Sequence, residues 1–279
     1  MDRADLHIHS TFSDGKLTPS KIVRVAEAKG LGAIALTDHD TLNGIPEFIH
    51  AESKSNLLRI PGVEISTEYK NQRFHLLGYY PPLDSKPVIN ALERLERSRK
   101  ERIPKMCEKL EELGIGISKE DVVAIANIAS PGRPHVGRAL VKIGAVDTVQ
   151  EAFDKYLGRG KPAYVEKERM NTIETIKLLR REHSIPVLAH PLLEKVQNLE
   201  QILLRFKQAG LIGVELGYKY GKHESWRDLQ NLESIATRLG LILTGGSDSH
   251  GDSSHSPIGG ITVSIRIANI IQQIHEEGY

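Results

Sequence analysis

Short apolar segments alternate with segments of helical periodicity through most of this sequence. In the first part, Thr18-Pro19-Ser20 predicts the start of a helix that ends at Gly30, and residues 45–53 predict a second helix. The strand-like segments around these helices are residues 5–10, 33–37, 58–66 and 73–79. A strand, a helix and a second strand form a β-α-β unit, in which parallel strands end at one edge of the sheet.

The same alternation resumes at Met170. Trp226 is expected to begin one of the helices and to anchor it to the core. The predicted helices are residues 172–183, 199–209 and 226–239, and the strands that follow them are residues 186–189, 213–216 and 241–244. About seven strands of mostly parallel character result. We therefore predict an α/β fold, in the form of a closed or nearly closed β/α barrel.

Strand signals are absent between residues 83 and 165, where Leu, Glu, Arg and Lys dominate. Pro104 predicts a kink or a break between two helices there, and residues 128–135 predict a loop. Further helices are expected over residues 136–143 and 149–156. We expect the barrel to comprise residues 1–82 and 166–279, with residues 83–165 inserted as a helical substrate lid.

Composition excludes several classes of protein. The 279 residues include 37 basic and 36 acidic side chains, so a basic surface that binds long duplex nucleic acid is not expected. Cys107 is the only cysteine, which excludes an internal disulfide and thiolate metal sites and is typical of a reducing compartment. The first residues show no signal segment, and no apolar run is long enough to span a membrane. We expect a cytoplasmic protein without a membrane partner.

Histidines and carboxylates recur where the predicted strands end. His7 and His9 flank Ile8, so their side chains project from one side of the opening strand about 7 Å apart, which suits two ligands of one metal ion. Taken singly, each such residue could instead serve as a cap or as a core hydrogen-bonding group. Their convergence from six β/α units on one barrel mouth favours a metal centre. The nine candidates are His7, His9, Asp14, His39, Glu64, His75, His190, Asp248 and His250.

Imidazole and carboxylate ligands without thiolate suit Zn, Mn or Fe. Nine ligands exceed what one ion can use, so a bridging carboxylate would let two or three divalent ions share them. No serine or cysteine nucleophile stands at a recognisable spacing from a base, and no Gly-rich phosphate loop is present. Attack by metal-bound water is therefore the simplest chemistry for such a site.

These motifs also resemble those of the polymerase and histidinol phosphatase (PHP) superfamily over nearly the whole chain. The resemblance rests on His7-Ile8-His9-Ser10 with Asp14, Thr37-Asp38-His39-Asp40, Pro61-Gly62-Val63-Glu64, His75-Leu76-Leu77-Gly78, Ala189-His190-Pro191 and Gly246-Ser247-Asp248-Ser249-His250. It implies a distorted (β/α)7 barrel with a trinuclear metal centre. The ligand sets that it implies are His7, His9, Glu64 and Asp248 for one ion, Glu64, His75 and His190 for a second, and Asp14, His39 and His250 for a third.

Within the superfamily, the helical insertion resembles that of the bacterial 3',5'-nucleoside bisphosphate phosphatases, which also trim the 5' end of short RNAs. The similar stretches are Gly132-Arg133-Pro134-His135 and Lys155-Tyr156-Leu157-Gly158-Arg159-Gly160-Lys161. This resemblance implies hydrolysis of the 3'-phosphate of a nucleoside bisphosphate, with a nucleotide or short oligoribonucleotide as substrate. A histidinol-phosphate phosphatase, or a non-catalytic or proofreading module of a larger assembly, remains open as an alternative.

Basic groups of the insertion are candidates for binding the rest of the substrate. Arg133 and His135 lie at a predicted junction between a loop and a helix, where a guanidinium and free backbone N–H groups suit a phosphate. Arg159 and Lys161 lie in a Gly-rich turn. Either pair could instead be a solvated surface pair. Arg99 and Arg102 share one helical face and are expected to be solvated, and Tyr218 and Tyr220 are expected to pack at the barrel rim.

Overall fold

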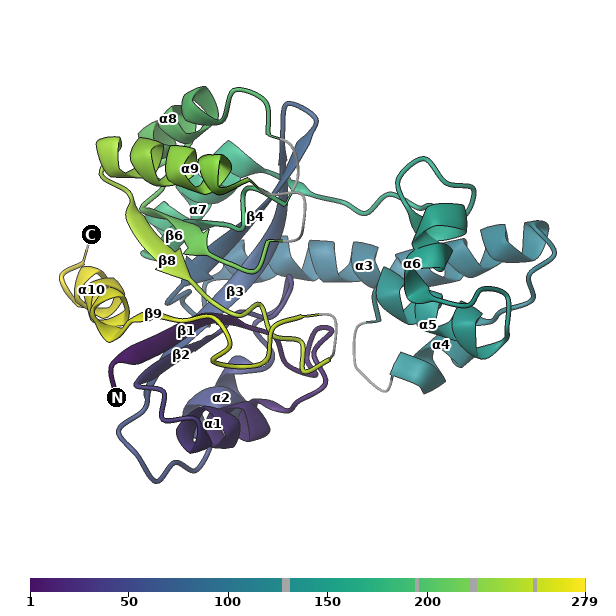
Figure 1. Ribbon diagram of the computed structural model, residues 1–279, viewed down its shortest axis with the longest axis horizontal. Helices are drawn as coiled ribbons and strands as arrows, with labels where there is room; N and C mark the ends of the chain where they lie inside the picture. Colours follow the sequence, from purple (N-terminus) through teal and green to yellow (C-terminus); the bar gives the residue numbers. More distant parts are fainter. Residues whose placement is uncertain (127–130, 194–195, 221–224, 253–254, 279) are drawn as a thin grey trace. The chain divides into compact units, whose positions relative to one another are not determined.

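The chain folds into two compact units, residues 1–92 with 169–279, and residues 93–168. The structure is a computed structural model that describes residues 1–126, 131–193, 196–220, 225–252 and 255–278 (Figure 1). We refer to the first unit as the barrel unit and to the second as the helical unit. No helix among the described residues is long and apolar enough to cross a membrane.

The barrel unit is built on one curved sheet of strands in the order β8-β7-β6-β4-β3-β2-β1-β9, with β5 paired to β3. Seven of these strands have four or more residues: β1 (Arg3–Ile8), β2 (Ala33–Leu36), β3 (Leu58–Tyr69), β4 (Gln72–Tyr79), β6 (Ile185–Ala189), β7 (Gly213–Gly217) and β8 (Ile242–Gly245). The other two, β5 (Met170–Asn171) and β9 (Val263–Ser264), are short. A parallel bridge between Ile8 and Ser249 joins β1 to the segment after β8. The predicted nearly closed β/α barrel is therefore confirmed.

Strand β4 runs antiparallel to both of its neighbours, β3 and β6, and this departs from a regular β/α barrel. Only Lys70 and Asn71 separate β3 from β4, and both have positive φ, of 49° and 61°. Two consecutive residues of positive φ form the tight turn that matches the twist of a hairpin. The sheet is thus a distorted barrel, because a hairpin replaces a helical crossover at this point.

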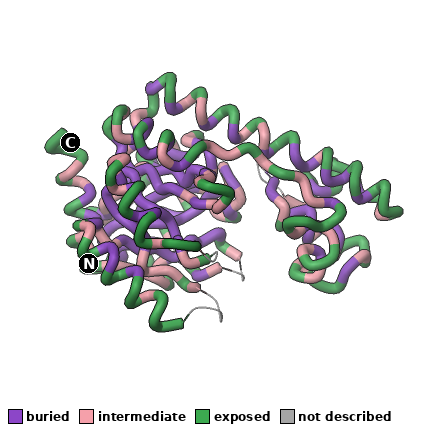
Figure 2. The backbone as a smooth tube through the Cα atoms, turned by 90° about the horizontal axis from the view of Figure 1, so that it is seen from above, coloured by how far each residue is buried: buried purple, intermediate pink, exposed green. Residues whose placement is uncertain are grey.

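Helices cover the outside of this sheet and leave the strands buried between them (Figures 1 and 2). Side-chain caps fix several helix starts: Thr18 accepts a hydrogen bond from Lys21 N, Asn171 from Glu174 N, and Ser225 from Asp228 N. The helices are α1 (Pro19–Ala28), α2 (Ile45–His50), α7 (Thr172–Arg181), α8 (Leu199–Ala209), α9 (Trp226–Arg238) and α10 (Ile265–Glu276).

Trp226 begins α9 as predicted but does not anchor it, since its side chain is 72% exposed. The buried residues of α9 are Leu232, Ile235 and Ala236, which pack in the cluster that contains Phe206. An indole at the first helical position lies ahead of this apolar face, so the prediction that it packs in the core was wrong.

The helical unit contains most of α3 (Lys86–Glu112), with α4 (Lys119–Ala126), α5 (Arg133–Lys142), α6 (Val149–Ala152) and a π-helical turn, η1 (Phe153–Leu157). Pro104 lies inside α3, which continues through it, so the predicted break was wrong. Ile103, Met106 and Leu110 of α3 are buried in the core of this unit. A proline inside a helix removes one backbone hydrogen bond and destabilises the helix by about 3 kcal/mol. The packing of these three side chains offsets that loss.

Arg99 and Arg102 on the same helix are only 7% and 8% exposed, so the prediction that they are solvated was also wrong. Both lie on the part of α3 that belongs to the helical unit, close in sequence to the buried Ile103. Long guanidinium side chains cover apolar surface with their methylene groups, which allows this degree of burial. The predicted loop residues 128–130 lie outside the described part of the chain.

Gly246 allows the segment after β8 to approach β1. A Cβ at this position would lie 2.4 Å from the backbone N and 2.5 Å from the Cβ of His7. Gly246→Ala should therefore lower the free energy of unfolding of the barrel unit by about 1–3 kcal/mol, as overpacking does. Urea unfolding followed by circular dichroism measures this change.

Gly116→Ala is the matched control, because a Cβ at Gly116 would meet nothing within 4 Å. This control should unfold at the same urea concentration as the parent chain. Equal midpoints for both variants would contradict the close approach at Gly246.

Candidate metal centre

The fold brings the nine predicted ligands together at one end of the barrel. His7 is the second-last residue of β1, which ends at Ile8, and His9 and Asp14 follow that strand. Glu64 lies within β3 and His75 within β4. The others follow strands, as predicted: His39 follows β2, His190 follows β6, and Asp248 and His250 follow β8.

One group combines His7, His9, Glu64 and Asp248, all buried. His9 Nε2 lies 3.1 Å from His7 Nε2, 3.2 Å from Glu64 Oε2 and 3.0 Å from Asp248 Oδ1. His7 Nε2 lies 3.4 Å from each of the two carboxylate oxygens. Ligand atoms about 2.1 Å from one ion and 90° to 110° apart are separated by about 3.0–3.4 Å. The spacing of these four atoms therefore fits a single divalent ion.

One oxygen of each carboxylate in this group has ion-pair contacts with histidines but no hydrogen bond among the described residues. Glu64 Oε2 and Asp248 Oδ1 are buried and accept no hydrogen bond within the described residues. A buried anionic oxygen without a hydrogen bond is costly unless a cation lies beside it. This pattern of unsatisfied oxygens fits a metal ion better than a network of hydrogen bonds.

Glu64 extends the cluster towards a second group through its other oxygen. Glu64 Oε1 lies 2.7 Å from His75 Nδ1 and 2.9 Å from His190 Nε2, while Oε2 lies 2.9 Å from His39 Nδ1. His39, Glu64 and His75 could hold one ion together. Glu64 is thus oriented as a bridging carboxylate. The His75 side chain is 31% exposed, so this part of the centre opens to solvent.

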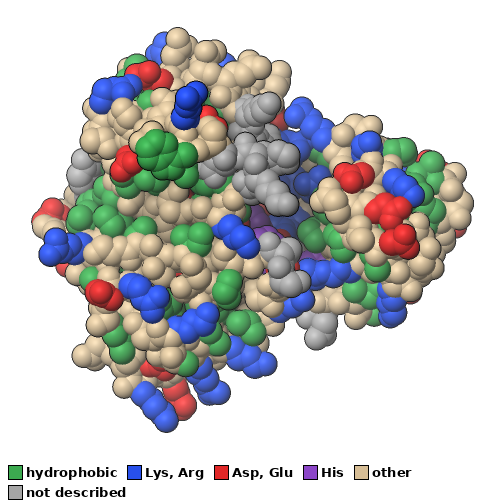
Figure 3. Space-filling model, viewed as in Figure 1, with side chains coloured by type: hydrophobic (Ala, Val, Ile, Leu, Met, Phe, Trp, Pro, Cys, Tyr) green, Lys and Arg blue, Asp and Glu red, His purple; other side chains and the backbone are tan. Residues whose placement is uncertain are grey.

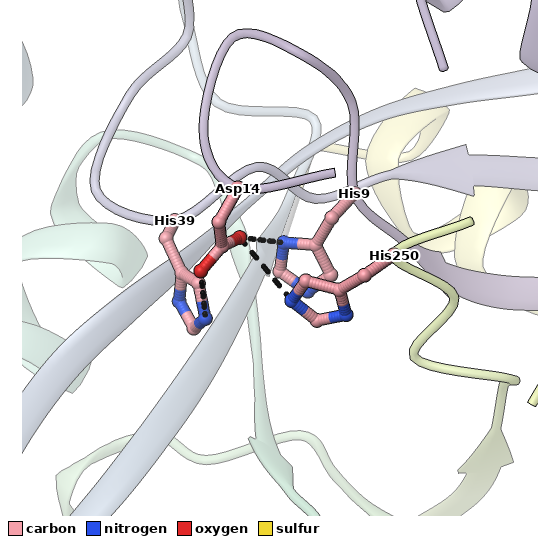
Figure 4. A group of neighbouring side chains, drawn as sticks. All are labelled: His9, Asp14, His39 and His250. Carbon is pink, nitrogen blue, oxygen red and sulfur yellow. Dashed lines mark ion pairs between the residues drawn. The ribbon is translucent and has the colours of Figure 1, made fainter. Parts of the chain in front are cut away.

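A third group lies around Asp14 (Figure 4). Asp14 Oδ1 is 3.2 Å from His250 Nε2 and 3.9 Å from His9 Nδ1, and Asp14 Oδ2 is 3.9 Å from His39 Nε2. These four residues could hold one ion. His9 contributes to this group through Nδ1 and to the first group through Nε2. The assignment of each ligand to one particular ion remains a prediction.

His255, which is not among the nine predicted ligands, lies at the edge of this cluster. Its ring stacks on that of His250, with centroids 4.0 Å apart, and its Nδ1 is 2.9 Å from Asp252 Oδ1. Asp248, His250 and His255 form a further candidate group. His255 lies outside the predicted strand ends, and only the fold brings it to this cluster.

The charges of the cluster shift the pKa values of its members. Burial alone would lower the pKa of His9, but Asp248 and Glu64 raise it to about 10. Burial dominates at His39 and lowers its pKa to about 3 despite nearby Glu64. Burial would raise the pKa of both carboxyl groups, yet the surrounding imidazoles hold the pKa of Glu64 and of Asp248 well below their usual range. Without metal, protons on imidazole rings supply the positive charge that these carboxylates need.

Three buried carboxylates that sequence analysis did not identify support the centre from outside. Asp38 accepts hydrogen bonds from Ser10 and Ser13, and Asp5 accepts them from Ser247 and the backbone N of Gly259. The third, Glu215, contacts His7. Asp38 lies within the motif Thr37-Asp38-His39-Asp40, next to the predicted ligand His39. Glu215 lies near the end of β7, which is where polar residues of the predicted strands were expected to act.

Two ligands have strained backbones, with φ of 26° at His190 and 50° at Asp248. Residues other than glycine adopt positive φ at a cost of order 1–3 kcal/mol, and such strain is found mainly at functional sites. Tyr218 does more than pack at the rim, because its hydroxyl donates to Asp248 Oδ2 at 3.0 Å. That hydrogen bond leaves Oδ1 of Asp248 for the first group.

The predicted substrate-binding residues all lie in the helical unit. Arg133 is the first residue of α5, and its guanidinium lies over the rings of Phe153 and Tyr164, 5.4 and 5.7 Å from their centroids. His135 is buried, and its Nδ1 accepts a hydrogen bond from Gly132 N at 3.0 Å. One ring nitrogen of His135 therefore caps α5. Arg159 and Lys161 are exposed.

Comparison with known proteins assigns the family. The model of the PHP domain matches residues 5–158, which is more than half of the chain. The chain belongs to the PHP family. It is 34% identical to a 5'-3' exoribonuclease of Haemophilus influenzae over 248 residues, covering 88% of this chain and 89% of that protein. It is 31% identical to a 3',5'-nucleoside bisphosphate phosphatase of Chromobacterium violaceum over 253 residues, covering 90% and 88%.

Solved structures agree with this assignment. A protein of Bifidobacterium adolescentis assigned as a metal-dependent phosphoesterase has a TM-score of 0.88 at 27% identity, over 97% of this chain and 96% of that one. An amidohydrolase of Chromobacterium violaceum with bound SO4 and no metal has a TM-score of 0.85 at 28% identity, with the same coverage. These findings confirm the predicted PHP-type barrel and the predicted enzyme class, a hydrolase of phosphoric esters.

Metal loading of this PHP-family centre should release protons. His9 has a pKa of about 10 in the metal-free chain, so it is protonated at neutral pH and must lose a proton before a ring nitrogen can bind a metal. Metal affinity should therefore rise with pH until about pH 10. Isothermal titration calorimetry of Mn²⁺ binding in two buffers of different ionisation enthalpy measures the released protons. Binding heats that are independent of the buffer would contradict the protonated state of His9.

Proposed function

We propose that this PHP-family enzyme hydrolyses the 3'-phosphate of nucleoside 3',5'-bisphosphates and trims short 5'-phosphorylated RNA in the 5'-3' direction. The observation that carries the proposal is the near full-length similarity to two relatives, one named as a 5'-3' exoribonuclease and the other as a 3',5'-nucleoside bisphosphate phosphatase. Both substrates offer a phosphoester next to a second phosphate on one nucleotide. One site with one additional phosphate contact would therefore serve both reactions.

The proposal includes two or three divalent ions, of Mn, Fe or Zn, bound by the three ligand groups. Imidazole and carboxylate ligands are compatible with each of these metals. When bound, such ions ionise water at neutral pH and neutralise the charge of a phosphoryl group. Glu64 would bridge two ions, because its two oxygens face different histidines. Support for the first ion is the set of four ligand atoms around Glu64 Oε2 and Asp248 Oδ1.

The side chains of the centre orient the groups that take part in the reaction. Tyr218 donates its hydroxyl hydrogen to Asp248 Oδ2, which holds the carboxylate with Oδ1 towards His7 and His9. His250 Nδ1 donates to the backbone oxygen of Asp248 at 2.8 Å, which leaves Nε2, 3.2 Å from Asp14 Oδ1, for the third group. The partly exposed His75 marks the side from which a phosphate ester would enter. The substrate would thus meet a rigid set of ligands, with little rearrangement needed.

We further propose that residues of the helical unit bind the second phosphate and that this unit acts as a substrate lid. The candidates are Arg133, His135, Arg159 and Lys161. Arg133 is the strongest of them, because it stands at the N-terminal end of α5 and its guanidinium is held between Phe153 and Tyr164. A guanidinium fork suits a phosphate, whereas the backbone N–H groups of Gly132 and His135 already donate within this turn.

The first test is phosphate release by the Mn-loaded enzyme from adenosine 3',5'-bisphosphate, 3'-AMP, 5'-AMP and histidinol phosphate. We expect kcat/KM for the bisphosphate to exceed that for either monophosphate by about tenfold to a hundredfold, since one charge-assisted contact contributes about 1.5–3 kcal/mol. Metal content is measured on the same sample. A preference for histidinol phosphate would overturn the substrate while leaving the metal centre in place.

Arg133→Ala should lower kcat/KM for the bisphosphate by about tenfold to a hundredfold with the metal content unchanged, because it removes the proposed phosphate contact and Arg133 belongs to none of the ligand groups. Lys142→Ala, at the other end of α5, is the matched control and should leave both quantities unchanged. Asp248→Ala, in contrast, should deplete metal. Loss of metal in Arg133→Ala would contradict the separation between substrate binding and the metal centre.

A further inference from the structure

Glu215 is a buried carboxylate that belongs to none of the ligand groups. It lies in β7, and its side chain has no exposed surface. Its oxygens lie 3.1 Å (Oε1) and 3.2 Å (Oε2) from His7 Nδ1, and Oε2 also accepts a hydrogen bond from the backbone N of His190 at 3.0 Å. Among the described residues, its ion-pair partner is His7 rather than a Lys or Arg. A buried acid with this set of partners is costly to retain unless it has a specific role.

We propose that Glu215 is a positioning residue for the metal centre, which holds His7 in the ligand tautomer and fixes the backbone of His190. This inference rests on the proposed metal centre and adds a residue outside it. His7 belongs to the first ligand group, and His190 contacts the bridging Glu64 from the other side. One carboxylate would therefore prepare ligands on both sides of Glu64.

The tautomer follows from the chemistry of the two partners. A carboxylate can only accept hydrogen bonds, so in the neutral ring that a metal requires, His7 Nδ1 carries the hydrogen and Nε2 keeps its lone pair. Nε2 is the atom that lies 3.1 Å from His9 Nε2 and 3.4 Å from the oxygens of Glu64 and Asp248. A hydrogen bond from the second ring nitrogen to a carboxylate is the usual way in which a metal-binding histidine is oriented.

The contact with His190 has a separate physical reason. His190 has a φ of 26°, a conformation that a residue with a Cβ rarely adopts. The hydrogen bond from its backbone N to Glu215 Oε2 helps to hold this conformation, and it places the ring Nε2 2.9 Å from Glu64 Oε1. The rings of His7 and His190 lie nearly parallel, with centroids 5.7 Å apart. Glu215 contacts both residues, the first through its ring and the second through its backbone N.

Glu215→Gln tests the proposal with little change in volume. The amide offers one oxygen and one NH₂ group where the carboxylate offers two acceptors. If the NH₂ takes the place of Oε1, it opposes the N–H of the His7 ring, and the one remaining oxygen must accept from both His7 Nδ1 and His190 N. If the NH₂ faces His190, two donors oppose each other and the strained backbone loses its hydrogen bond. Either arrangement should weaken Mn²⁺ or Zn²⁺ binding by about tenfold to a hundredfold.

The measurement is metal content after dialysis against a chelator of known affinity, together with a competition titration and the thermal unfolding of the metal-free chain. Glu233→Gln is the matched control, since Glu233 is an exposed carboxylate on α9. A purely structural role for Glu215 predicts a lower unfolding temperature with metal affinity unchanged in the folded variant. That outcome, or affinity within about threefold of the parent chain, would overturn the proposal.

A second measurement does not depend on the variant. Nitrogen-15 chemical shifts of histidine in the Zn-loaded parent chain report which ring nitrogen of His7 binds metal. We expect Nδ1 to be protonated and Nε2 to be bound, and the opposite assignment would overturn the role of Glu215. A parent chain that binds no metal at all would overturn the proposed function and this inference together. A metal-binding parent with unchanged affinity in Glu215→Gln overturns this inference alone.

Discussion

Buried negative charge that faces imidazole rather than a basic side chain is the constraint on which the barrel unit depends. Glu64 and Asp248 are almost inaccessible to solvent, and their ion-pair partners among the described residues are histidines. A Lys or Arg at this depth would neutralise the carboxylates permanently and leave no place for another cation. Histidine can be either charged or neutral near physiological pH, so the same residues stabilise the metal-free fold as imidazolium and serve a metal as neutral ligands. The composition of the cluster therefore couples folding to metal binding.

The hairpin of β3 and β4 places Glu64, which we propose as the bridging carboxylate. Glu64 pairs with Leu77 and Ser66 pairs with His75 across the two strands, so Glu64 and His75 are diagonal neighbours on one face of the sheet. This relation accounts for the contact of 2.7 Å between Glu64 Oε1 and His75 Nδ1. A regular β/α crossover would separate these strands by a helix. The antiparallel β4 therefore brings two ligands from one hairpin into a barrel mouth that otherwise receives its ligands from separate strand ends.

The parts of this arrangement that follow from local sequence could be predicted, and the parts that need tertiary contacts could not. The alternation of polar and apolar residues around His7 and His9 predicts that the two side chains lie on one face, because successive side chains of a strand point to opposite faces. Glu215 also lies near the end of its strand, but its role is visible only when β7 and β6 lie beside each other and opposite His7. The continuity of α3 through Pro104 depends in the same way on a core that residues far along the chain complete. The direction of β4 was missed although Lys70-Asn71 leaves no room for a helix between the strands.

The three supporting carboxylates differ in the groups that donate hydrogen bonds to them. Asp5 and Asp38 bind hydroxyl and backbone groups of the segments that carry ligands, and so they fix loops. Burial raises the pKa of Asp5 to about 6 even though Ser247 and Gly259 donate to it, which means that charge at this position is tolerated rather than favoured. Glu215 differs because its donor is a ligand ring. A loop can be held by any acceptor of the right shape, whereas a ring tautomer requires an acceptor that cannot donate. The chain carries 37 basic and 36 acidic side chains, and both kinds are present on the face drawn in Figure 3, so net charge alone supplies little attraction for a phosphate ester.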